Sequence, residues 1–242
     1  MKTLGLIGGM SWESTALYYR ALNVEVARRL GARHSSKLLL HSVDFEPVVR
    51  RQHAGDLETL GRELADVAGR LEGAGADAIV LCTNTMHAVA PSIQRAIGVP
   101  LLHIADSVGE ALRDDGHEVV GLLGTRFTME APFYRERLAT RFGLRVCTPD
   151  DADRNDVHRI IYDELCRGTV RDESRDRYRN VVNKLERAGA TAIVLGCTEI
   201  GMLLPPGTLD VPTFDSLELH CRTAVEFQLM GTRRRTPTGQ AG

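Results

Sequence analysis

The sequence predicts an α/β protein made of two similar Rossmann-like parallel-sheet domains, related by pseudo-twofold symmetry, with the active site in the cleft between them. Two observations carry this prediction. Short apolar segments alternate with longer amphipathic segments, which is typical of strands and helices that build a parallel sheet. Segments of the first half of the chain also return in the same order in the second half, as they do in an internal repeat.

The composition is that of an ordinary globular chain. The 242 residues are 43% hydrophobic and 26% charged, which excludes a disordered or fibrous protein. A domain of about 150 residues is usual, so the length allows one large or two small domains. The formal net charge of −2 argues against a nucleic-acid-binding protein, because such proteins normally carry a basic excess.

The sequence also indicates the compartment. No apolar run approaches the roughly 18 residues of a transmembrane helix, and the N-terminal segment lacks the features of a signal peptide. The 5 cysteines are widely spaced, so they do not form a disulfide framework and instead suggest a reducing compartment. We therefore expect a cytoplasmic protein that binds neither a membrane nor nucleic acid. We expect no metal site, because the 8 histidines are scattered and no C-x-x-C or H-E-x-x-H motif occurs.

The first half of the chain predicts four strands with helices between them. Ser11 is placed to cap the first helix, and Gly31 lies just past its end. A second helix begins at Asp56 and ends at Gly73, because its apolar residues recur every three or four positions. A short helix precedes Ile97. The predicted strands are residues 4–8, 38–43, 78–81 and 99–104.

The second half repeats this pattern. A helix capped by Thr128 and ended by Gly143 follows the first strand of this half, and later helices cover residues 153–167, 172–188 and 216–230. The predicted strands are residues 119–124, 144–146, 193–195 and 211–214. We expect residues 1–98 plus 210–230 to form the first domain, 99–209 the second, and 231–242 a flexible tail, which is rich in Arg, Thr, Pro and Gly.

The repeat is most specific at two cysteines. Residues 74–81 resemble residues 188–195, which lie 114 positions later. The first copy is followed by Cys82-Thr83, and the second by Cys197-Thr198 after an inserted Gly196. A generic apolar strand would not bring a Cys-Thr pair with it, so we interpret the match as two related halves.

The paired cysteines predict acid–base chemistry. In open parallel sheets, ligands bind at the carboxyl ends of the strands, where Cys82 and Cys197 each precede a helix. The N–H groups of a helix N-terminus favour a thiolate, and a modest lowering of the usual thiol pKa of about 8.5 lets it act as acid and base near pH 7. If one sulfur lies on each side of a ligand, one thiolate removes a proton from a carbon and the other thiol returns one. A stereocentre is thereby inverted without a cofactor.

Neighbouring residues suit an amino-acid ligand. Thr83, Asn84, Thr85 and Thr198 offer short polar side chains and N–H groups for a carboxylate, although such residues are also common helix caps. Glu199 is placed to orient the second thiol or to balance its charge. The Gly8-Gly9-Met10-Ser11 turn and its counterpart Gly124-Thr125 lack a nucleotide-binding pattern, and we expect these glycines to let the backbone approach a small ligand. Three cysteines have no symmetric partner and are expected to be buried or incidental: Cys147, Cys166 and Cys221.

Three motifs resemble the aspartate/glutamate racemase family, and within it the broad-specificity amino-acid racemase branch: residues 5–15 (GLIGGMSWEST), 81–87 (LCTNTMH) and 195–201 (LGCTEIG). The resemblance covers essentially residues 1–230. It implies a racemase without pyridoxal phosphate or another cofactor, commonly a homodimer, with Cys82 and Cys197 as the acid–base pair. It implies as substrate contacts Met10, Gln52, Thr83, Asn84, Thr85, Thr125 and Thr198, with Ser11 and Glu199 in support.

One departure bears on specificity. The aspartate-specific members are similar but hold two carboxylates with an Arg after the second strand and a Lys in the second half. Here the corresponding regions read Arg50-Arg51-Gln52 and Asp163-Glu164, so we predict a broader range that includes neutral or hydroxylated amino acids.

Several alternatives stay open at this point. The same scaffold hosts hydantoin racemases, a maleate cis–trans isomerase and a decarboxylase of disubstituted malonates, besides the racemases specific for aspartate or glutamate. The decarboxylase needs only one of the two cysteines, so the presence of both argues against it. An amino-acid-binding protein that kept the cleft is the non-enzymatic alternative.

Overall fold

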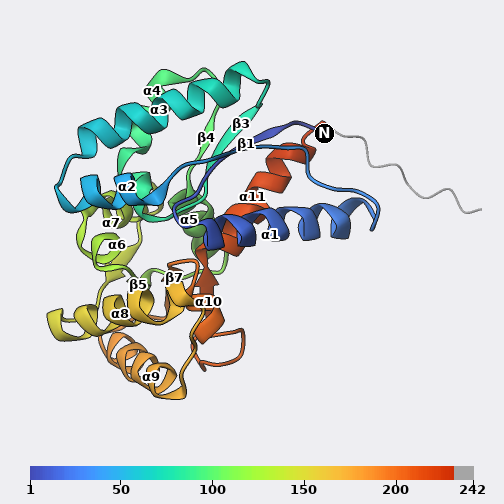
Figure 1. Ribbon diagram of the computed structural model, residues 1–242. Coiled ribbons are helices and arrows are strands. Elements are labelled where there is room, and N and C mark those ends of the chain that lie inside the picture. Colours follow the sequence, from blue (N-terminus) through green and yellow to red (C-terminus); the bar gives the residue numbers. More distant parts are fainter. Residues whose placement is uncertain (232–242) are drawn as a thin grey trace, which may run out of the picture.

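A computed structural model of the chain, which describes residues 1–231, contains two four-stranded sheets with helices on both faces (Figure 1). The strand orders are β2-β1-β3-β4 and β6-β5-β7-β8. All strand pairs are parallel. The two sheets therefore have the same topology, which confirms the predicted fold class of two similar parallel-sheet units.

The central strands of both sheets are buried on both faces. In the first sheet, β1 (Leu4–Gly8) and β3 (Ala78–Leu81) lie between β2 (Leu38–Ser42) and β4 (Leu101–Leu102). In the second, β5 (Val119–Gly124) and β7 (Ala192–Gly196) lie between β6 (Arg145–Cys147) and β8 (Thr213–Asp215). Such strands read as continuous apolar runs because both of their faces pack against helices.

Two groups of helices cover the first sheet. On one face, α1 (Trp12–Leu30) and α11 (Ser216–Leu229) form a core with the central strands. On the other face lie α2 (Phe45–His53), α3 (Leu57–Gly73), the 3₁₀ helix η1 (Thr85–Val89) and α4 (Ala90–Ala96). Ser11 caps α1 as predicted, because its Oγ accepts the Ser14 N–H at 3.2 Å.

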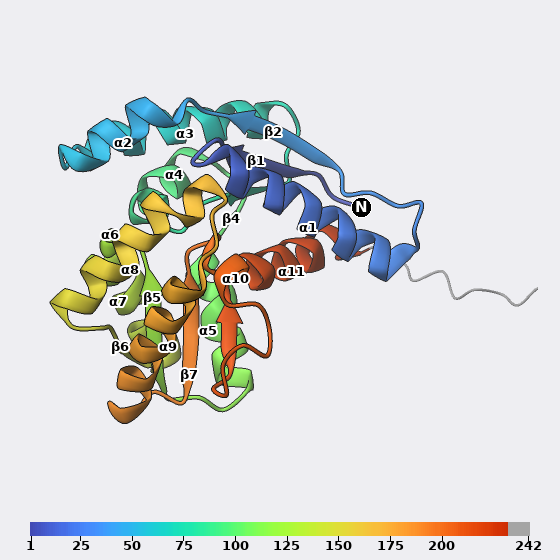
Figure 2. The same cartoon turned by 60° about the horizontal axis from the view of Figure 1, so that its bottom comes forward.

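The second sheet is covered in the same way. On one face, α5 (Ile104–Asp114) and α7 (Pro132–Phe142) form a core with β5 and β7. The other face carries α8 (Asp151–Asp163), the 3₁₀ helix η2 (Leu165–Arg167), α9 (Asp172–Arg187) and α10 (Ile200–Leu203). Figure 2 shows α8 and α9 in front of this sheet. The short α6 (Arg126–Glu130) joins β5 to α7.

Three predicted elements were wrong in detail. The strand expected over residues 99–104 is limited to two residues, because α5 begins at Ile104 with His103 as its N-cap. Thr128 does not begin the helix of the second half: Thr125 caps α6, and Pro132 begins α7, at the first position, which suits proline. The helix expected over residues 153–167 ends at Asp163. The helices α2 and α5 were not predicted.

Helix α11 contacts both halves. Leu217 and Cys221 belong to the core of the first sheet, whereas Leu219 packs with α5 and the second sheet. Figure 1 shows α11 beside α1 near the junction of the halves. The domain boundaries near residues 98 and 210 stay a prediction, and the predicted tail from 232 onward lies outside the described residues.

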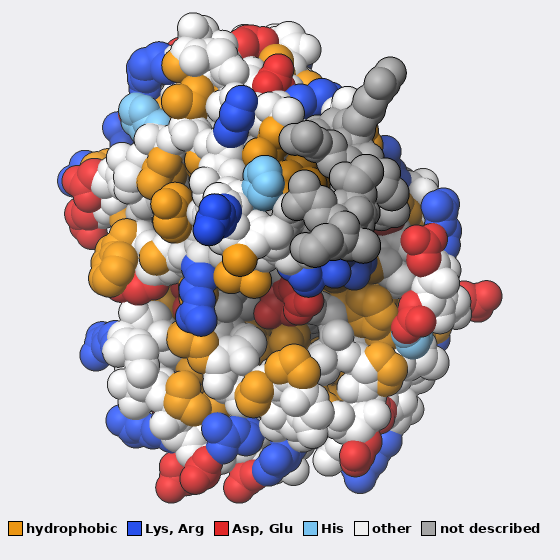
Figure 3. Space-filling model, turned by 90° about the vertical axis from the view of Figure 1, so that its right-hand side faces the viewer, with side chains coloured by type: hydrophobic (Ala, Val, Ile, Leu, Met, Phe, Trp, Pro, Cys, Tyr) orange, Lys and Arg blue, Asp and Glu red, His pale blue; other side chains and the backbone are white. Residues whose placement is uncertain are grey.

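The surface carries charges of both signs. Figure 3 shows one face of the molecule, on which basic and acidic side chains are interspersed. Between residues 1 and 231, no helix combines the length and the apolar character that crossing a membrane requires.

Three buried histidines lie together where β3 and β4 end. The ring centroids of His87 and His103 are 4.6 Å apart, and those of His87 and His220 are 5.7 Å apart. His220 Nε2–H donates to the Leu102 carbonyl at 2.8 Å, and its Nδ1 lies 2.8 Å from the Tyr18 hydroxyl oxygen. Burial favours the neutral ring of His220, and in that ring Nδ1 accepts the Tyr18 hydroxyl.

His87 is neutral for the same reason. The Ile104 N–H donates to its Nε2 at 3.2 Å, so Nδ1 carries the ring proton and donates to the Thr83 carbonyl at 2.7 Å. Burial lowers the pKa of His87, lowers that of His103 to about 2, and lowers that of His220 to about 4.

The cluster predicts a loss of stability in mild acid. Each histidine binds a proton in the unfolded chain below its ordinary pKa of about 6.5 but not in the folded protein, so each lowers the free energy of unfolding by about 1.4 kcal/mol per pH unit. We expect urea denaturation to show a steep fall between pH 6.5 and 5. His220→Gln reduces this slope by about one third, whereas His34→Gln, on the exposed surface, leaves it unchanged. A free energy of unfolding that is constant over this range would contradict the prediction.

Candidate active site

A cavity of about 60 Å³ lies between the two halves. This volume holds a few water molecules, so it suits a small ligand. Ten residues that the sequence pointed to line it: Met10, Ser11, Gln52, Thr83, Asn84, Thr85, Thr125, Cys197, Thr198 and Glu199. The remaining lining residues carry no sequence signal of a site: Ser14, Phe45, Met86, Ile161, Tyr162, Cys166 and Gly196.

Cys82 is the predicted site residue that the structure does not bring to the cavity wall. Its side chain is fully buried in the core that α1 and α11 form with the first sheet, near Tyr18 and Cys221. Its Sγ–H is directed at the Val80 carbonyl, 3.9 Å away. Burial raises the pKa of this thiol far above its ordinary value. The next residue, Thr83, lines the cavity.

Cys197 does line the cavity. Its Sγ donates to the Glu199 carboxylate Oε2 at 2.9 Å. Burial and the adjacent carboxylate raise the pKa of this thiol, and the Glu199 backbone N–H lowers it by less. The expected lowering of both thiol pKa values by helix N-termini is therefore wrong. The helices that follow the cysteines have only five and four residues, so their dipoles are weak against burial.

A hydrogen-bonded network joins the halves at Glu199. Ser14, in the first turn of α1, donates to Glu199 Oε1 at 2.8 Å, and its Oγ lies 2.5 Å from Thr198 Oγ1. Thr198 donates to Glu199 Oε2 at 2.6 Å. The carboxylate thus accepts hydrogen bonds from two hydroxyls and one thiol, which satisfy its oxygens in a buried place.

Asn84 is fixed in orientation. The Ser216 hydroxyl donates to the Leu195 carbonyl at 2.7 Å, so its oxygen accepts the Asn84 Nδ2–H at 3.1 Å. The remaining polar atom of the amide, Oδ1, is buried and has no hydrogen-bond partner. A buried acceptor without a partner is costly, so Asn84 is suited to receive a donor from a ligand in the cavity that it lines.

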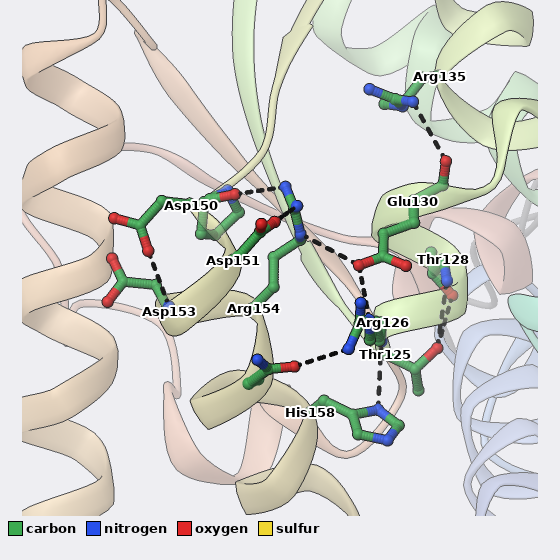
Figure 4. Close-up of polar contacts among 12 residues, drawn as sticks. Thr125, Arg126, Thr128, Glu130, Arg135, Asp150, Asp151, Asp153, Arg154 and His158 are labelled. Carbon is green, nitrogen blue, oxygen red and sulfur yellow. Dashed lines mark hydrogen bonds and ion pairs between the residues drawn. The ribbon is translucent and has the colours of Figure 1, made fainter.

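Short helices of the second half form another wall. Thr125 caps α6 and contacts Thr128 at 3.1 Å, and Thr128 in turn reaches Thr85 of the first half at 3.4 Å. Figure 4 shows how α6 is held on α8. The Arg126 backbone N–H donates to His158 Nδ1 at 3.2 Å, and Glu130 pairs with Arg154 at 3.3 Å.

The part of the cavity next to Cys197 is largely apolar. Ile161, Tyr162 and Cys166 come from the end of α8 and the following η2, and Phe45 from α2. Burial raises the pKa values of Tyr162 and Cys166 to about 12, so both are neutral near pH 7. Among the lining residues, all of which belong to the described part of the chain, none is Lys, Arg or His.

The glycines of the first turn pack against protein atoms, contrary to the expectation that they open space for a ligand. A Cβ on Gly9, whose φ is +91°, would lie 2.1 Å from the Val43 carbonyl oxygen, and one on Gly8 would lie 2.5 Å from Thr15 Cγ2. A Cβ on Gly124 would lie 2.9 Å from the Gly196 oxygen. These residues therefore allow the strand ends to approach neighbouring segments.

Known proteins share this architecture. The crystal structure of an Asp/Glu racemase candidate from Yersinia pestis superposes with a TM-score of 0.90 at 50% identity, over 95% of this chain and 100% of that one. An aspartate racemase homologue from Pyrococcus horikoshii OT3 gives 0.82 at 34% identity, over 94% and 99%. In sequence, the chain is 24% identical to the broad specificity amino-acid racemase RacX of Bacillus subtilis over 174 residues, which are 72% of this chain and 74% of RacX.

The likeness extends to a whole family. The model of the family described as Asp/Glu/Hydantoin racemase matches residues 7–224. This range contains both cysteines, the residues that line the cavity, and all strands apart from the first three residues of β1. The chain therefore belongs to the Asp/Glu/Hydantoin racemase family, a family of isomerases.

Proposed function

We propose that the protein is a cofactor-independent amino-acid racemase that inverts the α-carbon by a two-base thiol/thiolate mechanism. One observation carries the proposal. The Cys197 thiol donates a hydrogen bond to the Glu199 carboxylate and lines a small cavity. The residues that follow Cys82 line the same cavity. Membership of a racemase family supports it.

The cavity wall offers partners for the groups that all amino acids share. Asn84 Oδ1, which has no partner, accepts a hydrogen bond from the substrate ammonium. The hydroxyls of Thr83, Thr85 and Thr125, all on the wall, are donors for the carboxylate. Together, Asn84 and these threonines hold the α-carbon of the substrate between the ends of β3 and β7.

The proton transfers balance without a cofactor. Cys197 passes its S–H proton to Glu199 and becomes a thiolate, which removes the α-proton and forms an S–H bond. The Cys82 thiol then gives its proton to the opposite face of the α-carbon. Burial keeps Cys82 protonated near pH 7, so this thiol carries the proton that the step needs. The Cys82 sulfur lies in the core beneath the cavity wall, and only the next residue, Thr83, lines the cavity. The step therefore requires the end of β3 to move toward the bound substrate.

The lining supports a broad specificity over strict use of aspartate as part of this proposal. An aspartate side chain would bring a second carboxylate to a wall that carries Glu199 and, within the described chain, no cation. Burying an unpaired charge is costly. Phe45, Ile161 and Tyr162 instead favour neutral apolar or hydroxylated side chains.

A single-thiol reaction is the second candidate. The burial of Cys82 away from the cavity favours it, since Cys197 is then the only member of the cysteine pair that meets the substrate. Decarboxylation of a disubstituted malonate is such a reaction. A hydantoin racemase, a maleate cis–trans isomerase and an aspartate- or glutamate-specific racemase are the alternatives that differ in substrate. The homodimer and the cytoplasmic location stay predictions.

Replacement of either cysteine tests the two-base mechanism. In D₂O without added cofactor, the parent protein should exchange the α-hydrogen of an amino acid and destroy its optical activity. Cys82→Ser and Cys197→Ser should each lower racemisation by 10²-fold or more, because a hydroxyl replaces an acid–base thiol. Cys147→Ser, remote from the cavity lining, is the matched control.

The outcome for Cys82 separates the candidates. If Cys82→Ser racemises at the parent rate, the second base is not Cys82. If neither the parent protein nor Cys82→Ser racemises an amino acid, and both release carbon dioxide from a disubstituted malonate at the same rate, the single-thiol reaction is the correct one.

A substrate panel tests specificity. We expect kcat/KM for alanine, serine and methionine to exceed that for aspartate by tenfold or more, because the cavity wall lacks a cation for a second carboxylate. Gln52→Arg places a cation on that wall, so the ratio should move toward aspartate, whereas Gln52→Met should not move it in that direction. Racemisation of aspartate or glutamate alone would sink the broad-specificity proposal.

A further inference from the structure

We propose that Ser14 is a positioning residue which, from the first half of the molecule, holds the Glu199 carboxylate against the Cys197 thiol in the second half. Its catalytic consequence rests on the proposed function, whereas the positioning of the carboxylate does not. Neither the sequence motifs nor the family membership gave this serine a role.

The contacts of Ser14 carry the inference. It lies in the first turn of α1 and is 3% exposed. Its Oγ donates to Glu199 Oε1 at 2.8 Å and lies 2.5 Å from Thr198 Oγ1. The two partners are separated from Ser14 by more than 180 residues along the chain. Ser14 therefore links α1 to the segment that carries the cavity thiol.

Glu199 depends on such donors. The side chain is buried, and no ion pair with a Lys or Arg of the described residues reaches it. Its oxygens accept from Ser14, Thr198 and Cys197 instead. These hydrogen bonds satisfy the buried carboxylate and fix its orientation.

The position of the carboxylate decides how strongly it acts on the thiol. Glu199 Oε2 accepts the Cys197 S–H at 2.9 Å, and this contact raises the pKa of the thiol. The hydroxyl of Ser14 holds the other oxygen, Oε1, at 2.8 Å. Without that hydroxyl, the carboxylate is free to turn away from the sulfur, and its effect on the thiol weakens.

The other titratable groups around the sulfur are neutral near pH 7. Cys166 of η2, Tyr162 of α8 and Tyr178 of α9 interact with Cys197. Burial raises the pKa values of all three groups. Glu199 is thus the charged group that acts on this thiol, and Ser14 acts through Glu199.

Alkylation measures the effect of the carboxylate on the thiol without any substrate. The full-length protein is treated with iodoacetamide across a pH series, and labelling of each cysteine is followed by mass spectrometry. In Ser14→Ala, the Glu199 carboxylate is no longer held 2.9 Å from Sγ, so it raises the pKa of the thiol less and the pH midpoint for Cys197 should fall by about one unit. Ser14→Thr keeps the hydroxyl and should restore the parent midpoint. Cys147, outside the cavity lining, serves as the internal control.

A second variant separates this role from a loss of structure. Glu199→Gln removes the carboxylate and should also lower the Cys197 midpoint, and adding Ser14→Ala to it should cause no further shift, because Ser14 acts through that carboxylate. An unchanged midpoint in Ser14→Ala overturns the proposal. So does faster labelling of the buried Cys82 and Cys221 together with Cys197, since this would report general loosening. The midpoint is independent of turnover, so absence of racemisation would reject the proposed function and leave the Ser14 proposal standing.

Discussion

Burial of the central strands on both faces is the constraint on which the rest of the structure depends. β1, β3, β5 and β7 leave no room for polar side chains along their length, because helices cover both sides of each sheet. Polar chemistry is therefore confined to the segments that follow the strands. Because α11 packs on both units and holds the two sheets together, these segments meet in one cavity.

The electrostatics of that cavity follow from how little charge it contains. Glu199 is satisfied by hydroxyls and a thiol rather than by a cation. A zwitterionic amino acid suits such a wall, since Asn84 Oδ1 and the threonine hydroxyls complement its two charged groups with dipoles. Any further charge on the substrate would stay uncompensated. The carboxylate of Glu199 thus has two effects in this cavity. It repels a second carboxylate on a ligand, and it raises the pKa of the Cys197 thiol.

The sequence was informative where the pattern is local or repeated. The eight strands, the capping of α1 by Ser11 and most of the cavity lining follow from apolar runs, cap residues and the doubled Cys-Thr motif. The helix α5 was missed because the apolar run before it continues directly into its buried face. Ile161, Tyr162 and Ser14 reach the cavity through the packing of α8 and α1, which no local pattern encodes.

The two cysteines differ because of one inserted residue. Leu81 and Leu195 are equivalent in the repeat and point to equivalent faces of their sheets. Cys82 follows Leu81 directly and so points to the opposite face, whereas Gly196 is inserted before Cys197 and returns that side chain to the face of Leu195. A shift by one residue reverses the face in a strand. Cys82 is thus shielded and lacks a carboxylate partner, whereas Cys197 is bonded to one in the cavity. Two thiols that look equivalent in the sequence therefore start from unequal proton affinities, and a racemase built on them must move the end of β3 to use both.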